Sequence, residues 1–201
     1  RTMGSLIPEG VHWIKAAVSA FEPEKNAVIL DGCRVVKYNR LVVAPGLKLN
    51  WNGIEGLVET LGRNGVTSNY RYDLAPYTWE LVSSLKEGRA LFTQPPMPVK
   101  CAGAHEESLY LSADQWYRNG VINDIEIEFY NAGGVLFGVK EYVPALMEYI
   151  DRYNAHLNLE SQLVAVDGPA RIATFEQKRG DTNKRIEVKF DMLHVVPPQR
   201  A

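Results

Sequence analysis

The feature that most constrains the fold is the alternation of strand-like and helix-like patterns in the second half of the chain. Apolar runs at 90–93 and 193–196, and an alternating run at 125–129, have the patterns of strands. Apolar residues at helical spacing occupy 101–119 and 140–156 between these runs. Strands that alternate with helices predict an α/β unit built on a parallel sheet.

Short strands in antiparallel succession, or strand meanders, are predicted at two further places. One meander lies within 163–190 and leads into the last apolar run. Another lies within 9–40, where Asp31-Gly32 favours a two-residue hairpin turn, and leads into an apolar run at 41–44 that predicts a buried strand. The whole pattern predicts fold class α/β, a Rossmann-like FAD/NAD(P)-binding fold with antiparallel strand meanders in three layers.

The middle of the chain connects these two parts. Residues 47–72 are rich in glycine and asparagine and predict a crossover loop. Asp73 as an N-cap and Pro76 in the first turn predict the start of a helix, which Gly88 ends.

Composition limits the function before any motif is considered. The 201 residues include 22 Lys and Arg and 24 Asp and Glu, a net charge of −2, which argues against electrostatic capture of nucleic acid or of an anionic membrane. No apolar run approaches the ~20 residues that span a bilayer. Two cysteines, Cys33 and Cys101, fit a reducing compartment. The chain opens on Arg1 rather than on Met, which predicts a piece of a longer protein.

The turn that would bind the phosphates of a dinucleotide is missing. In a dinucleotide-binding unit the first strand runs into G-x-G-x-x-G, whose backbone amides reach the pyrophosphate. Here the strand at 90–93 runs into Gln94 to Pro98, a segment with three prolines. Proline removes an amide donor, and its ring blocks the approach of a phosphate. The sequence therefore predicts that this unit does not bind NAD(P).

Cys101 follows directly in the place of that turn. If a helix begins near Ala102, the thiol lies at the positive end of the helix and beside Lys100, and both effects favour the thiolate. The alternative is that Cys101 is a small buried hydrophobic residue, as most free cysteines are. Position alone leaves the two interpretations equally open.

Seven segments resemble blocks of the sulfide:quinone oxidoreductases of mitochondria and many bacteria, in the same order along the chain. The segment around Cys101 and the last segment are the more specific ones. The segments are Trp13-Ile14-Lys15-Ala16, Leu41-Val42-Val43-Ala44-Pro45-Gly46, Ser68-Asn69-Tyr70, Phe92-Thr93-Gln94-Pro95, Pro98-Val99-Lys100-Cys101-Ala102-Gly103-Ala104, Leu136-Phe137-Gly138-Val139-Lys140 and Asp191-Met192-Leu193-His194-Val195-Val196-Pro197-Pro198.

The resemblance implies a flavoprotein enzyme with two tandem nucleotide-binding-like units. In such an enzyme sulfide attacks an oxidised cysteine pair and leaves a persulfide, whose sulfur passes to an acceptor thiol. Two electrons pass through FAD to a membrane quinone. The whole protein would lie peripherally on an energy-conserving membrane, either the bacterial or the mitochondrial inner membrane. The present chain alone would be soluble and inactive, and would not retain FAD.

The resemblance also assigns parts of the chain and single residues. Residues 1–47 match the end of an FAD-binding unit, 48–87 a crossover loop and helix, and 88–201 a second Rossmann-like unit that is degenerate for NAD(P). Cys101 matches one cysteine of the redox pair. The residues expected near the cofactor are Val18, Ala44, Pro45 and Gly46, and those expected near the quinone are Pro197 and Pro198.

The chain departs from the family just after Cys101. The family continues after Cys-Ala-Gly-Ala with proline and usually has a lysine one turn on, where this chain has His105, Glu106 and Glu107. A lysine there would stabilise a thiolate, whereas Glu107 would oppose it, although carboxylates also suit the first turn of a helix. His105 is either a proton relay for sulfide or, more commonly, an exposed loop histidine.

The remaining cysteine and histidines predict no further chemistry. The resemblance implies that the partner of Cys101 lies beyond the second unit, and Cys33 follows a hairpin turn where the family has no redox cysteine. His12, His156 and His194 have no ligand spacing to one another or to the cysteines, and no metal site is predicted.

Two alternative functions stay open at this point. One is an NADH:quinone oxidoreductase of similar architecture, against which the proline-rich segment argues. The other is a non-catalytic homologue or scaffold module, in which His105, Glu106 and Glu107 mark lost chemistry.

Overall fold

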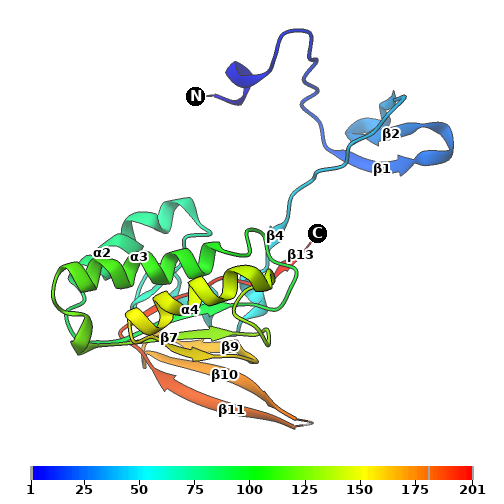
Figure 1. The fold of residues 1–201 in the computed structure, drawn as a ribbon. Coiled ribbons are helices and arrows are strands. Elements are labelled where there is room, and N and C mark those ends of the chain that lie inside the picture. The colour runs from blue at the N-terminus through cyan, green and yellow to red at the C-terminus, as the bar shows by residue number, and fades with distance from the viewer. Residues whose placement is uncertain (1, 181, 201) are drawn as a thin grey trace. The chain divides into compact units, whose positions relative to one another are not determined.

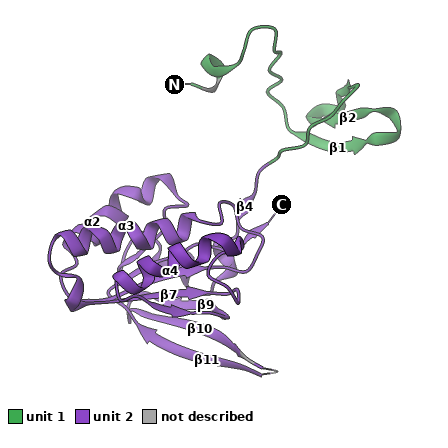
Figure 2. Cartoon of the chain, viewed as in Figure 1, with its two compact units in different colours: residues 1–45 green, residues 46–201 purple. Residues whose placement is uncertain are grey.

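The structure, a computed structural model, describes residues 2–180 and 182–200. Contacts divide the chain into two compact units, residues 1–45 and residues 46–201 (Figure 2). Unit 1 contains a small antiparallel sheet, and unit 2 contains a parallel sheet with helices and a strand meander.

Unit 1 is built on three antiparallel strands in the order β1-β2-β3. One turn of 3-10 helix at Asp31–Cys33 joins β2 to β3, and Gly32 within it has φ 75°. The hairpin predicted here is therefore present, with a longer turn than the predicted two-residue type. The elements are a 3-10 helix (Met3–Leu6), β1 (Val18–Glu22), β2 (Ala27–Leu30) and β3 (Val35–Lys37).

The buried strand predicted at 41–44 is wrong. These residues belong to no strand, and Leu41, Val42 and Val43 are 40%, 90% and 57% exposed. An apolar strand is buried where neighbouring strands pair with it and other layers cover both of its faces. The sheet of unit 1 ends at β3, and the described residues of that unit offer 41–44 no strand partner.

The centre of unit 2 is a sheet in the order β5-β12-β6-β7-β8, in which every neighbouring pair is parallel. β6 and β7 pair along their whole length, from Gly88 opposite Ile125 to Gln94 opposite Asn131. β12 lies between β5 and β6, so that the carboxyl ends of early and late strands meet at one edge. The strands are β5 (Val66–Thr67), β6 (Gly88–Gln94), β7 (Ile125–Asn131), β8 (His156–Asn158) and β12 (Met192–His194).

Helices cover one face of this sheet and a meander covers the other (Figure 1). The meander has the order β11-β10-β9. The predicted three-layer α/β fold is confirmed. The covering elements are α2 (Ala75–Ser84), α3 (Ala104–Arg118) and α4 (Val143–Arg152) on one side, and β9 (Ser161–Asp167), β10 (Ile172–Arg179) and β11 (Thr182–Lys189) on the other, with α1 (Leu57–Thr60) and a small ribbon of β4 (Lys48–Leu49) and β13 (Gln199–Arg200) beside them.

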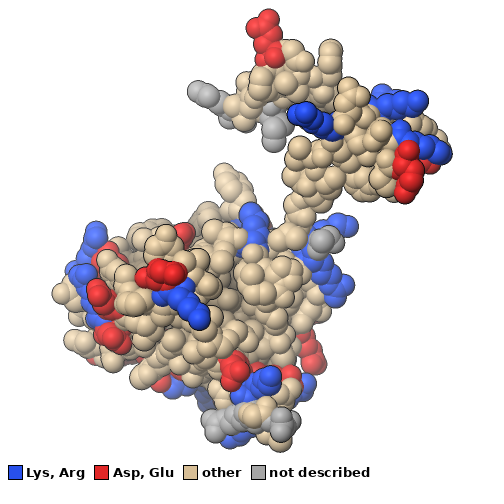
Figure 3. Space-filling model, turned by 45° about the vertical axis from the view of Figure 1, so that its right-hand side comes forward, with Lys and Arg blue, Asp and Glu red and all other residues tan. Residues whose placement is uncertain are grey.

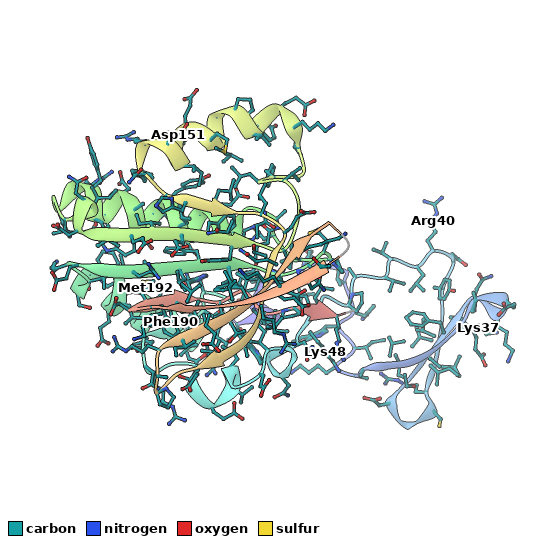
Figure 4. All side chains as sticks on the ribbon, turned by 90° about the horizontal axis from the view of Figure 1, so that it is seen from below. Lys37, Arg40, Lys48, Asp151, Phe190 and Met192 are labelled. Atoms are coloured by element: carbon teal, nitrogen blue, oxygen red, sulfur yellow. The ribbon has the colours of Figure 1, made fainter. Side chains whose placement is uncertain are left out.

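The alternation of side chains along β6 explains why the sheet is buried on both faces. Leu91 belongs to the core between sheet and meander, and Ala90 and Phe92 belong to the core between sheet and helices. Phe190 and Met192, at the entry to β12, likewise divide between these two cores inside unit 2 (Figure 4). Apolar runs without polar alternation are typical of parallel strands for this reason.

Three local predictions differ from the structure. Residues 47–72 contain β4, α1 and β5 rather than only a loop. The helix predicted over 140–156 ends at Arg152, and His156 begins β8. Asp73 is not the N-cap of α2: a 3-10 turn at Tyr72–Leu74 leads directly into the helix.

Candidate functional site: the Cys101 loop

Cys101 lies in the loop that leaves the carboxyl edge of the parallel sheet. β6 ends at Gln94 and α3 begins at Ala104, so residues 95–103 stand where a dinucleotide-binding unit has its tight turn. The thiol is free and the residue is exposed, which rules out the alternative of a buried hydrophobic cysteine. The Cys101 backbone has φ 58°, a left-handed conformation that is uncommon for a residue with a side chain.

Hydrogen bonds hold the backbone on both sides of Cys101. Tyr70 Oη donates to the carbonyl oxygen of Lys100 at 2.6 Å and reaches that of Cys101 at 3.4 Å. The Lys100 amide donates to Gln199 Oε1 at 2.6 Å. The Ala104 amide donates to the Cys101 carbonyl oxygen at 3.1 Å and ties the loop to α3. The cysteine is therefore exposed on a backbone that is fixed at several points.

The Tyr70 phenol also interacts electrostatically with the thiol. Burial, and next the charge of Cys101, raise the pKa of Tyr70 above its ordinary value. The Gln199 side chain opposes this rise in pKa, and the charge of Glu107 adds to it. Tyr70 and Gln199 thus lie against the backbone of the Cys101 loop, and the charge of Glu107 acts on Tyr70.

The first turn of α3 buries two ionisable side chains. His105 is 0% exposed and Glu106 is 3% exposed, with His105 Nε2 at 3.8 Å from Glu106 Oε1. Burial lowers the pKa of His105 to about 4 and raises that of Glu106 to about 7. The His105 ring stacks on Phe129 at a centroid distance of 5.8 Å. The interpretation of His105 as an exposed loop histidine is therefore wrong.

The phase of α3 is the signal that could have predicted this burial. The helix faces the sheet with a stripe at intervals of three and four residues, which begins at His105. Glu106 lies beside the stripe, whereas Glu107 is exposed. The buried residues on the stripe are His105, Ser108, Leu109, Ser112, Ala113 and Trp116.

His194 lies close to His105 despite its distance in sequence. It is the last residue of β12, is 0% exposed, and accepts a hydrogen bond at Nε2 from the Asn69 amide at 3.1 Å. Asn69 Nδ2 in turn donates to Ser108 Oγ at 3.2 Å. Burial, and next the charge of His105, lower the pKa of His194 to about 4. The spacing of the histidines in sequence gave no sign of this pairing.

The residues predicted near FAD are exposed, and the described part of unit 1 lacks a phosphate-binding turn. Val18 in β1 is 47% exposed, and Ala44 and Pro45 are exposed. Gly46 has φ 78°, and a Cβ there would meet no atom within 4 Å, so a ligand could approach its backbone closely. The part of unit 1 that the structure describes contains no α-helix, and therefore lacks the strand-turn-helix junction that holds a pyrophosphate. A role of these four residues in cofactor binding stays a prediction.

Of the remaining residues, Pro197 and Pro198 belong to unit 2 and Cys33 belongs to unit 1. Pro197 is buried and Pro198 half-buried, and the Pro198 carbonyl oxygen accepts a hydrogen bond from the Asn50 amide at 2.8 Å. Their place near a quinone stays a prediction. Cys33 is exposed on the hairpin of unit 1. Tyr70 and Gln199 lie beside the Cys101 loop without a sequence pattern that indicates it, apart from the family-like segment Ser68-Asn69-Tyr70.

The described residues form no metal-ion site and no membrane-spanning helix. Over residues 2–180 and 182–200, no three His, Cys, Asp or Glu side chains gather as a metal-ion site. Every helix in the same ranges is too short or too polar to cross a bilayer. Positive and negative side chains are interspersed on the face that Figure 3 shows, with no large area of one sign.

Known proteins with similar sequences include mitochondrial sulfide:quinone oxidoreductases of several organisms. The mitochondrial sulfide:quinone oxidoreductase of Dictyostelium discoideum is 40% identical over 194 residues, which are 96% of this chain and 42% of the relative. That of Mus musculus is 36% identical over 203 residues, or 100% of this chain and 44% of the relative. The chain thus spans less than half the length of these curated relatives. No protein-family profile matches it.

Solved structures agree on the fold. The sulfide:quinone oxidoreductase of Aquifex aeolicus superposes with a TM-score of 0.69 at 19% identity, over 92% of this chain and 42% of the other. A chain of the Tetrahymena thermophila mitochondrial ATP synthase gives 0.73 at 21% identity, over 92% and 46%. The chain is homologous to the sulfide:quinone oxidoreductases along nearly its whole length, and it has the same fold as the corresponding part of one of them.

Proposed function

We propose that this chain is part of a flavoprotein that oxidises sulfide at Cys101 and passes the electrons through FAD to a quinone. The observation that supports this most is the exposed Cys101 on a fixed loop, in a chain 40% identical to a sulfide:quinone oxidoreductase. Within this proposal, residues 1–47 complete an FAD-binding unit, 48–87 form the crossover, and 88–201 form a second unit that has lost NAD(P). Association with an energy-conserving membrane belongs to the same proposal.

The proposed chemistry at Cys101 starts from a disulfide with a second cysteine of the whole protein. Hydrosulfide attacks this disulfide, so that its S–S bond breaks and a new S–S bond forms a persulfide on one cysteine. The other cysteine leaves as a thiolate. An external thiolate then attacks the outer sulfur of the persulfide, which leaves with it as a new persulfide, and the cysteine is released as a second thiolate. The two cysteine thiolates re-form their disulfide by giving up two electrons, for which FAD, when bound, would be the acceptor on the way to quinone.

The polar surroundings of Cys101 suit this exchange. An exposed sulfur is open to an incoming hydrosulfide and to the acceptor thiol. The fixed backbone keeps the sulfur in one place while its bonds change. Glu107 is exposed and acts electrostatically on Tyr70, so its negative charge would oppose the approach of an anionic nucleophile to this loop.

The proposed function is tested by following both sulfur and electrons in the whole protein. Sulfide should reduce a soluble quinone analogue, and quenching during turnover with a thiol-alkylating reagent should yield the peptide of Cys101 or of its partner cysteine with one additional sulfur. Mass spectrometry of that peptide is the measurement. Quinone reduction by NADH but not by sulfide would instead support the NADH:quinone alternative.

The same site predicts that NADH does not bind. Residues 95–103 include three prolines in place of the glycine-rich turn, and the first turn of α3 carries Glu106 and Glu107 where a pyrophosphate would lie. We expect calorimetric titration with NADH to give no saturable heat, which corresponds to a dissociation constant above about 1 mM. A saturable heat that disappears when ADP-ribose, the part of NADH without nicotinamide, competes for the site would overturn this expectation.

A further inference from the structure

Two side chains that are far apart in sequence meet on the peptide groups around Lys100. Gln199 Oε1 accepts a hydrogen bond from the Lys100 amide, and Tyr70 Oη donates one to the Lys100 carbonyl oxygen. Both distances are 2.6 Å, at the short end for hydrogen bonds of these types. The side chains of Tyr70 and Gln199 together are called the Lys100 clamp below.

Each half of the clamp is itself anchored. Gln199 is 7% exposed and lies in β13, where it pairs with Leu49 of β4. The Tyr70 amide donates to Ser68 Oγ at 3.2 Å, just beyond the end of β5. The clamp therefore transmits the rigidity of a strand ribbon and of the sheet edge to a loop that has no regular structure.

The conformation of Cys101 requires such support. A cysteine at φ 58° is less favourable than a glycine would be there, and persists only where its surroundings hold it. The peptide between Lys100 and Cys101 is the one whose carbonyl Tyr70 binds. Holding this peptide fixes the direction of the Cα–Cβ bond of Cys101, and with it the place of the sulfur.

We propose that Tyr70 and Gln199 are positioning residues that hold the Cys101 sulfur in its reactive direction by clamping the peptides on both sides of Lys100. This inference rests on the proposed function for its effect on turnover. Its effect on the loop itself is independent of any activity.

The test compares four variants of the whole protein. Tyr70→Phe removes the donor and keeps the ring, and Gln199→Leu removes the acceptor at nearly constant size. Gln199→Glu keeps an acceptor oxygen and serves as the conservative rescue. Tyr72→Phe is the matched control, because Tyr72 is 97% exposed and two residues from Tyr70.

Two readouts are expected to change together. Amide hydrogen exchange across 95–103 should accelerate about fivefold in Tyr70→Phe and Gln199→Leu, the factor for losing one ordinary hydrogen bond. The kcat for sulfide oxidation should fall on the order of tenfold, with KM for sulfide nearly unchanged, because the sulfur is misplaced rather than blocked. Gln199→Glu should recover most of the exchange protection but little of kcat, because its buried negative charge opposes the Cys101 thiolate, and Tyr72→Phe should match the parent protein.

The outcomes separate this proposal from the proposed function. Unchanged exchange in both clamp variants overturns the clamp, whatever the activity. If exchange is faster but kcat is unchanged, the two hydrogen bonds protect the loop but do not position the sulfur for reaction, and the positioning role is overturned. If sulfide oxidation survives loss of the Cys101 thiol, the proposed function fails, and the exchange data still decide whether the loop is clamped.

Discussion

Replacing Cys101 by serine in the whole protein should lower sulfide-dependent quinone reduction by at least about a thousandfold, the scale on which enzymes lose activity when their nucleophile is removed. A serine hydroxyl can form neither a disulfide nor a persulfide, so no part of the proposed sulfur exchange is left at this position. Because Cys101 is exposed, the substitution should leave the free energy of unfolding within about 0.5 kcal/mol of the parent. The measurement is the initial rate of quinone bleaching at saturating sulfide, with a denaturation curve beside it.

Cys33 provides the matched control for this experiment. It is also exposed and free, and it also has a left-handed backbone, φ 63°. Cys33→Ser should therefore retain the parent rate within about twofold, since a surface substitution without a chemical role has little effect. A Cys101→Ser protein with more than a tenth of the parent rate would remove Cys101 from the mechanism.

Much of the fold follows from the sequence because unit 2 is consistent from local pattern to packing. Strands β6 and β7 are long, and their apolar runs lie between two cores, so their positions could be predicted within two residues. Strands β5 and β8 are too short to leave a pattern, and they exist because the parallel sheet offers them a paired neighbour. The run at 41–44 has the pattern of a buried strand, but a pattern cannot supply the neighbours that would bury it.

The site divides in the same way between local and tertiary information. Cys101 is visible in sequence because its proline-rich loop replaces a known turn. Tyr70 and Gln199 could not be predicted as its neighbours, because the strand order β5-β12-β6 and the β4-β13 ribbon bring them there. The burial of His105 and Glu106 follows from the start and phase of α3, a local property that places the two residues under the helix rather than in the loop.

Replacing Glu106 by glutamine should stabilise the chain at pH 8 by up to about 3 kcal/mol. Burial raises the pKa of Glu106 from 4.5 to about 7, so the folded state holds a proton that the unfolded state releases. The stability that this proton provides is complete below pH 4.5 and is lost as the pH rises through 7. Glutamine has the shape of the protonated acid and does not ionise, so the variant does not lose this stability as the pH rises. The measurement is the free energy of urea unfolding at pH 4.5 and at pH 8, where the two proteins should differ only at pH 8.

The Glu106→Gln substitution should also make the free energy of unfolding rise more steeply with pH between pH 5 and 6. His105 and His194 have folded pKa values near 4 against 6.5 when unfolded, so both favour unfolding as the pH falls below 6.5. Between pH 5 and 6 the unfolded parent binds these two protons, and the folded parent binds one on Glu106. The net difference of one proton gives a slope of about 1.4 kcal/mol per pH unit. Without Glu106 the difference is two protons and the slope is about 2.7 kcal/mol per pH unit.

Glu107→Gln is the matched control, because this carboxylate is adjacent in sequence but exposed. Its loss should change stability by no more than about 0.5 kcal/mol at either pH, the contribution of one exposed charge near a helix N-terminus. If Glu106→Gln followed the parent curve at pH 8, the carboxyl group would have to be ionised and solvated in the folded protein, and α3 would have to leave its first turn open to water. Because His105 and Glu106 belong to the first turn of α3, and the Ala104 amide of the same turn donates to the Cys101 carbonyl, such an opening would also expose the base of the Cys101 loop. The stability of this buried cluster and the placement of the reactive sulfur are therefore expected to respond together to conditions that loosen the start of α3.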